Sequence, residues 1–159
     1  MTKGVFTRNL STQVGCESNG DITIVSEMTD QFHHFRLTIK AGRKSLVIKD
    51  LNLEMLKSPT PLCSKIIPEL KSLVGVGIGR GLTGKVLEIL GGHDGCINLK
   101  NMLLTSLPLA INIQAAYDTE GSESGQEKMH RRLEGTCMGY SLPYEETYPQ
   151  LYENAVMAK

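Results

Sequence analysis

The pattern of hydrophobic and polar positions predicts β-structure in the first third of the chain. Every second residue from Phe35 to Ile39 is hydrophobic, which is the period of a half-buried strand. Short hydrophobic runs at 21–30 and 45–50 predict two further strands, and Gly42 suits a tight connection before the last one. Residues 1–20 are polar and irregular and predict a loose arm or an edge element. We therefore expect an antiparallel meander of three or more strands.

Helical spacing replaces this alternation after residue 62. Pro68 suits the first turn of a helix. A hydrophobic stripe over 82–90 predicts a helix that ends at the glycine pair following it. A second stripe over 99–111 predicts a helix that Pro108 kinks or splits. The Ser-, Gly- and Glu-rich segment 119–126 predicts a flexible connection.

Strands followed by helices indicate an α+β fold, with the helices packed on one face of an antiparallel sheet. For domain organisation we expect an N-terminal arm (1–20), a single α+β domain (21–140) and a C-terminal tail (141–159). The tail contains tyrosines and prolines, which favours a protein partner. Nothing in the sequence indicates an oligomeric state.

Composition narrows the class of partner. Seventeen basic and seventeen acidic residues give a net charge of zero, so no global attraction to nucleic acid or to acidic membranes is expected. No apolar run has the length needed to cross a bilayer, and residues 1–9 lack the hydrophobic region of a signal peptide. We expect a cytoplasmic protein whose four separated cysteines are free thiols.

The most distinctive chemistry stands in the stretch Gly91-Gly92-His93-Asp94-Gly95-Cys96-Ile97-Asn98-Leu99. Cys96 follows a glycine turn and comes at the expected start of a helix, where the helix N-terminus favours the thiolate. His93 stands three residues earlier and is a candidate to assist thiolate formation or share a metal. Asp94 is a candidate for the N-cap of the helix. The alternative for Cys96 is a small, buried apolar side chain.

Two further thiols are candidates for the same site. Cys63 follows Pro61 near another expected helix start, so the same argument applies to it. Cys137 is the third candidate. Thiolates gathered in one place could hold an iron–sulfur cluster, zinc or persulfide sulfur.

A glycine-rich loop precedes the 82–90 helix. Its residues Gly79, Gly81 and Gly84 match the spacing Gly-x-Gly-x-x-Gly, but no parallel strand is expected before them, as dinucleotide binding requires. Lys85 is followed by Val86 in place of the hydroxyl residue of a phosphate loop. The open alternatives are close packing of the glycines and an anion site formed by backbone N–H groups and Lys85.

A histidine pair, His33 and His34, stands at the expected strand. Neighbouring strand residues point to opposite faces, so the two imidazoles cannot face one metal without a bulge. We expect one to be buried and hydrogen-bonded and the other to be exposed.

These motifs resemble a bacterial family, domain of unknown function 2889. Leu73–Gly81 resembles its Leu-Val-Gly-x-x-Ile-Gly-x-Gly block, and Leu90–Leu99 resembles its Leu-Gly-Gly-x-x-Gly-Cys-x-His-Leu block. Pro59, Pro61 and Cys63 fall where the family has a proline-rich stretch with a cysteine. Asn98 stands where the family has histidine, so either it keeps a structural hydrogen bond or His93 takes the lost role. Gly95 is shared with the family block.

A more distant resemblance is to NifU-type iron–sulfur scaffolds and SufE-type sulfur acceptors, which place cysteines similarly in the order of elements. It implies a scaffold or carrier in which Cys63 and Cys96 converge, with His93 and Asp94 beside them. One alternative is a non-catalytic interaction protein or accessory subunit. The other is a thiol enzyme that uses Cys96 with His93.

Overall fold

The computed structural model describes residues 4–117 and 125–149. The chain divides into two compact units, residues 1–113 and 114–159. This boundary falls inside the range 21–140 that we expected to be one domain, and the arm and tail boundaries stay predictions. Most of the expected flexible segment, up to residue 124, lies outside the described residues, and its last two residues begin α5 (Gly125–Leu133).

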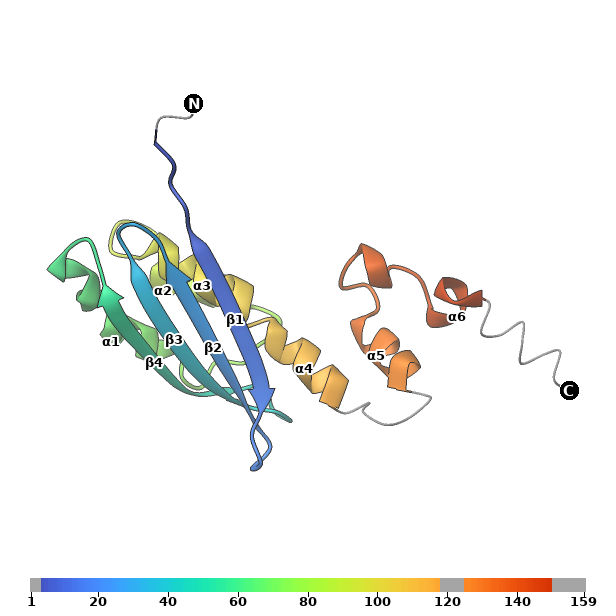
Figure 1. The fold of residues 1–159 in the computed structure, drawn as a ribbon. Coiled ribbons are helices and arrows are strands. Elements are labelled where there is room, and N and C mark those ends of the chain that lie inside the picture. The colour runs from blue at the N-terminus through green and yellow to red at the C-terminus, as the bar shows by residue number, and fades with distance from the viewer. Residues whose placement is uncertain (1–3, 118–124, 150–159) are drawn as a thin grey trace, which may run out of the picture. The chain divides into compact units, whose positions relative to one another are not determined.

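A four-stranded antiparallel meander forms the described sheet of the first unit, as the alternation predicted (Figure 1). Its strands pair in chain order and are β1 (Asn9–Cys16), β2 (Asp21–Thr29), β3 (His34–Gly42) and β4 (Ile48–Lys57). The edge element expected before residue 21 is β1, which pairs along its whole length with β2.

The last strand begins later than predicted. Residues 43–45 form a turn, and the Leu46 N–H donates to the Gly42 carbonyl at 2.7 Å. Leu46 has a φ of 52°, in the left-handed region, so the chain cannot extend as a strand from residue 45. A Cβ at Gly42 would lie 2.6 Å from Ser45 Oγ, so a larger residue there would require the serine side chain to rotate away. The strand then continues through 51–57, for which the sequence left open a continued strand or irregular structure.

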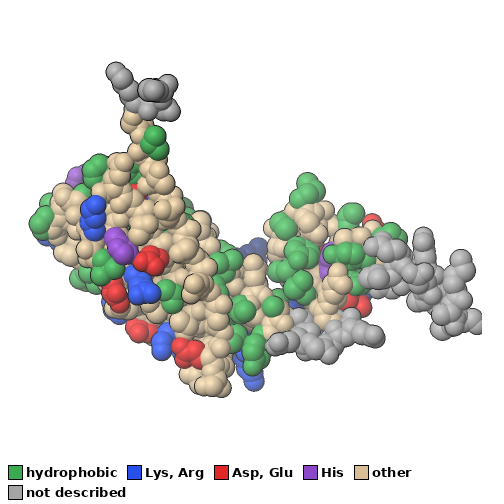
Figure 2. All heavy atoms as spheres, in the orientation of Figure 1, with side chains coloured by type: hydrophobic (Ala, Val, Ile, Leu, Met, Phe, Trp, Pro, Cys, Tyr) green, Lys and Arg blue, Asp and Glu red, His purple; other side chains and the backbone are tan. Residues whose placement is uncertain are grey.

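The two faces of the sheet differ in polarity. Side chains such as Ile24, Leu37 and Leu51 are at most 1% exposed and face the helices. The opposite face carries charges that alternate in sign across the strands, with Arg36 paired in register between Glu27 and Glu54. Figure 2 shows this face with acidic and basic side chains interspersed. Such a face is solvated, so the single core lies on the helix side.

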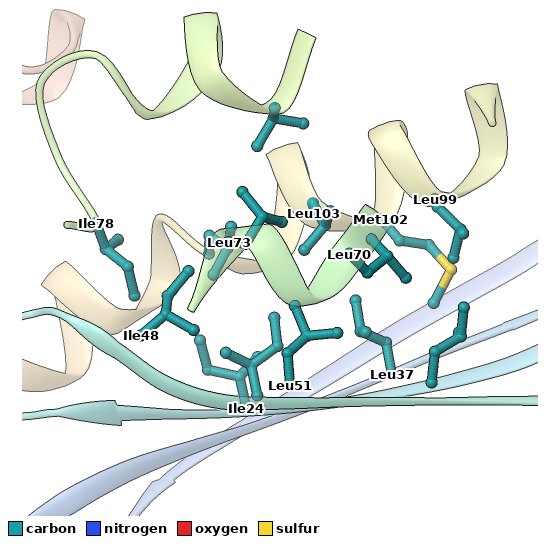
Figure 3. Close-up of a cluster of buried hydrophobic side chains, with 14 of the residues drawn as sticks. Ile24, Leu37, Ile48, Leu51, Leu70, Leu73, Ile78, Leu99, Met102 and Leu103 are labelled. Atoms are coloured by element: carbon teal, nitrogen blue, oxygen red, sulfur yellow. The ribbon is translucent and has the colours of Figure 1, made fainter. Parts of the chain in front are cut away.

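The helices of the first unit cover that one face, behind the sheet in Figure 1. They are η1 (Pro61–Ile66), α1 (Ile67–Leu70), η2 (Lys71–Leu73), α2 (Leu82–Leu90) and α3 (Ile97–Ser106). The next helix, α4 (Leu109–Tyr117), contains the boundary between the two units, which falls after Ile113. Pro68 stands in the first turn of α1, and Pro108 separates α3 from α4, both as predicted. Leu70, Leu73 and Met102 point from the helices into the layer above the strands (Figure 3). The α+β class predicted from the sequence is confirmed.

The second unit has its own buried centre. It contains α5, η3 (Met138–Tyr140) and α6 (Tyr144–Thr147). His130 is only 1% exposed, its Nε2–H donates to the Leu142 carbonyl at 2.8 Å, and the rings of Tyr140, Tyr144 and Tyr148 stand edge-on to it. Across the residues described in both units, no helix has the length and apolar character that crossing a membrane requires.

Candidate functional site

A pocket of about 550 Å³ lies between the η1–α1 segment and the turn that joins α2 to α3. Cys63 lines it from η1, and Cys96 lines it from the start of α3. Both cysteines are partly exposed free thiols. The structure thus brings to one pocket two of the three thiols that the sequence singled out. The other lining residues are Thr60, Leu62, Lys65, Ile66, Glu69, Ile89, His93, Asp94 and Gly95.

Close backbone packing in the α2–α3 turn positions Cys96. The Gly91 N–H ends α2 by donating to the Leu87 carbonyl at 2.9 Å, and Gly92 has a φ of 71°. A Cβ added at Gly95 would lie 2.1 Å from the Leu90 carbonyl oxygen, so this approach requires glycine. The glycine that the chain shares with the family block at position 95 is therefore needed for the turn to close beside Cys96.

Cys96 is the N-cap of α3. Its carbonyl accepts from the Lys100 N–H at 2.9 Å, and its extended backbone (φ −134°, ψ 109°) is typical of that position. The side chain makes no capping hydrogen bond. The sulfur lines the pocket, and the first N–H groups of α3 begin beside it.

Cys63 is held by the turn that starts η1. Its N–H donates to the Thr60 carbonyl at 3.2 Å, and its Sγ lies 3.7 Å from Thr60 Oγ1. Lys65 adds a cation to the lining, and Glu69 and Asp94 add carboxylates. The pocket therefore combines two soft nucleophiles with charges of both signs.

The sequence was wrong about Asp94 as the N-cap, which is Cys96. The Asp94 and His93 side chains are fully exposed, and His93 Nδ1 lies 3.2 Å from Asp94 Oδ1. The hydrogen-bond partner that the structure gives His93 is this neighbouring carboxylate. His93 lines the same pocket as Cys96, but the side chain that its imidazole contacts is Asp94 and not the thiol. A role for His93 as the base that deprotonates Cys96 stays a prediction.

Cys137 belongs to the other compact unit, where it is exposed and precedes η3. Among the residues that the structure describes, no group of three or more His, Cys, Asp or Glu side chains is arranged to hold a metal ion. A structural zinc or an iron–sulfur cluster takes four protein ligands as a rule. The described residues therefore do not fit a metal centre, and we derive no chemistry through one.

The glycine-rich loop before α2 has a conformational role. Gly81 has a φ of 88° and stands at the N-cap of α2, where a side chain would be strained. The Lys85 ammonium pairs with Glu88 at 2.8 Å along the same helix. The strand pairing described above is antiparallel, so the loop lacks the parallel context of a dinucleotide site. The anion site at Gly79, Gly81, Gly84 and Lys85 stays a prediction.

The structure also shows a hydrogen-bonded chain that the sequence reasoning missed. His33 Nδ1 lies 2.9 Å from Asp30 Oδ1, and His33 Nε2 lies 3.1 Å from Asn98 Nδ2. Arg8 donates from Nε and Nη2 to Asp30 Oδ2 at 2.8 and 2.6 Å. His34 instead contacts Glu27 at 2.5 Å. Asp30 three residues before His33 is a visible signal, but no local pattern links residue 33 to residue 98.

A comparison with protein-family models identifies the family of this chain. The family model described as "Protein of unknown function (DUF2889)" matches residues 6–112. No curated protein and no solved structure matches the chain. The family resemblance expected from the sequence is confirmed, and the more distant resemblance to NifU- and SufE-type proteins is not supported.

Proposed function

The chain belongs to the DUF2889 family of proteins of unknown function, and we propose that its first unit is a carrier of sulfane sulfur, which Cys96 holds as a persulfide. The observation that supports this proposal is the shared pocket of Cys63 and Cys96. Two partly exposed thiols, one at a helix N-terminus, suit sulfur exchange between thiols better than metal binding by the described residues.

The proposed loading step is a thiol exchange without net oxidation. The Cys96 thiolate attacks the outer sulfur of a donor persulfide, the donor's sulfur–sulfur bond breaks, and the donor leaves as a thiolate. Cys96 then carries the extra sulfur. The Cys63 thiolate can take this outer sulfur by the same exchange, which returns Cys96 to a thiolate.

Single-cysteine variants test this proposal. A chain that keeps only Cys96 is exposed to a low-molecular-weight persulfide, and intact mass is followed for the gain of one sulfur, about 32 Da. The matched control keeps only Cys137, an exposed thiol outside the pocket. We expect faster and more persistent sulfur addition at Cys96. Equal rates and lifetimes on the two chains would exclude the carrier function.

A second candidate function, protein–protein contact, is favoured by exposed apolar side chains. Val5, Phe6 and Phe32 are 67%, 54% and 54% exposed, and the two phenylalanine rings stack with centroids 6.1 Å apart. Large exposed apolar groups that adjoin one another are typical of interaction surfaces. If the partner is a second copy of the chain, sedimentation in solution should detect a dimer. The double variant Phe6→Ser with Phe32→Ser should then be monomeric. A chain that stays monomeric at high concentration excludes that partner.

A further inference from the structure

The Asp30–His33–Asn98 chain joins the sheet to the helix that begins at Cys96. Asp30 and His33 belong to the turn between β2 and β3, and Asn98 is the second residue of α3. The Asn98 residue is 8% exposed, and the His33 side chain is 14% exposed. This buried contact lies two residues after the Cys96 thiol.

Hydrogen-bond chemistry fixes the direction of each contact. The Asp30 side chain is fully buried and accepts from Arg8 and from the N–H groups of Phe32 and His33. A carboxylate can only accept, so His33 Nδ1 carries the proton. Nε2 of a neutral imidazole then has a lone pair, which accepts from the Asn98 amide. Asp30 therefore sets the tautomer with which His33 holds Asn98.

We infer that His33 is a positioning residue for the Cys96 thiol and acts through its hydrogen bond to Asn98. This inference rests on the proposed function only in taking Cys96 as the working thiol. Asn98 anchors the first turn of α3, the same turn that the Lys100 N–H closes onto the Cys96 carbonyl. Anchoring keeps the uncapped N–H groups at the start of α3 aligned beside the sulfur.

The groups that the structure places against the His33 imidazole include the Asp30 carboxylate, Arg8 behind it, the Asn98 amide of α3 and the edge of the Phe35 ring on β3, whose centroid is 5.3 Å away. Asp30 holds one side of the ring, so loss of the bond on the other side should act on α3 and on the Cys96 thiol.

Two histidine variants separate the two hydrogen bonds. His33→Asn keeps an amide N–H near the Nδ1 position for Asp30 and leaves nothing for Asn98. His33→Gln places an amide oxygen near the Nε2 position, where it can accept from Asn98 without titrating. Asn98→Ala removes the anchor from the other side. Each variant is made in the full chain.

The readout is the rate at which iodoacetamide alkylates Cys96 at one fixed pH near neutrality. Peptide mass analysis reports Cys137 in the same sample as an internal control, since it lies in the other unit. Helix-terminus stabilisation of a charge is worth about two- to fivefold in an equilibrium constant. We expect His33→Asn and Asn98→Ala each to slow Cys96 by about that factor, with no further loss in the double variant.

His33→Gln should keep most of the wild-type alkylation rate at Cys96, because its amide oxygen still accepts from Asn98. Exchange of the Lys100 amide should rise in His33→Asn and stay low in His33→Gln. A general structural defect would alter the alkylation rates of Cys63 and Cys16 as much as that of Cys96, and that result would overturn the inference. Unchanged Cys96 rates in His33→Asn and Asn98→Ala would overturn it as well. None of these measurements uses a persulfide, so failure of sulfur carriage and failure of the positioning role are distinguishable.

Discussion

Asp30 is the residue whose charge is most tightly enclosed. Burial alone would raise the pKa of its carboxyl, but hydrogen bonds from the Phe32 N–H, His33 and Arg8 outweigh burial and hold this pKa well below its usual range. A carboxyl whose pKa is lowered in the folded state stabilises the fold at pH values above its unfolded-state pKa of about 3.9. That stabilisation is lost as the pH falls through and below this value.

Asp30→Asn should therefore lower the melting temperature at neutral pH and flatten its acid dependence. An amide cannot supply the charge that Arg8 and His33 contact, so less stability remains to be lost on acidification. Thermal unfolding followed by circular dichroism between pH 3 and about pH 7 measures both effects. Asp94→Asn is the control, because that carboxylate is fully exposed. Identical pH profiles for wild type and Asp30→Asn would contradict the argument.

Gly95 and Gly84 make a matched pair for the turn that carries Cys96. A Cβ at Gly95 would lie within 2.1 Å of the Leu90 carbonyl oxygen, whereas nothing lies within 4 Å of a Cβ at Gly84. Gly95→Ala should destabilise the fold by about 1–3 kcal/mol through overpacking. Gly84→Ala, inside α2, should stabilise it by about 0.4–1 kcal/mol. Urea unfolding of both variants measures the difference, and a neutral Gly95→Ala would show that the turn can open without cost.

At the scale of elements, β4 shows that the stability contributed by a leucine depends on how deeply its side chain is buried. Leu51 is 1% exposed and faces the helices, while Leu56 on the same strand is 60% exposed. Leu51→Ala should cost about 2–5 kcal/mol of unfolding free energy, because it leaves a cavity under the helical layer. Leu56→Ala should change it by less than about 0.5 kcal/mol. Denaturant unfolding of the two variants tests this, and equal losses would place the core elsewhere.

The elements that could be predicted from the sequence are those with a strong local pattern. The alternation around Phe35 and the stripe over 82–90 predicted β3 and α2 because one face of each is buried. Only an edge element was expected where β1 lies, because this edge strand buries little and alternates weakly. The predicted start of β4 was wrong because the left-handed backbone conformation of Leu46 is set by the turn and not by its side-chain type.

The candidate site was predictable only in its local parts. A glycine turn and a helix start mark Cys96, and a proline-rich stretch marks Cys63. Their common pocket depends on how η1 packs beside the α2–α3 turn, for which the sequence carries no local signal. The contact between His33 and Asn98 joins residues 65 positions apart, and it too depends on tertiary packing for which the sequence carries no local signal. Tertiary packing, which pattern does not encode, therefore determines which thiols and polar groups meet.

At the scale of the whole molecule, the two compact units bury separate centres. Sheet and helices enclose an extended apolar core in the first, whereas the described part of the second packs tyrosine rings around His130. Few large apolar side chains support that second centre, among them Leu133 and Tyr144. The stability of the second unit should therefore depend strongly on the His130 imidazole, whereas the stability of the first unit should depend on it far less.

Removing this ring tests whether the units are energetically separate. His130→Ala deletes the contacts to three tyrosines and the hydrogen bond to Leu142, so amide exchange over 125–149 should rise by about tenfold or more. Arg131→Ala is the adjacent control, because its exposed ion pairs with Glu127 and Glu145 are worth little. Exchange in β2 and β3 should match the wild type in both variants. If His130→Ala also loosens the strands, the two centres are coupled, and the chain then unfolds as one cooperative unit.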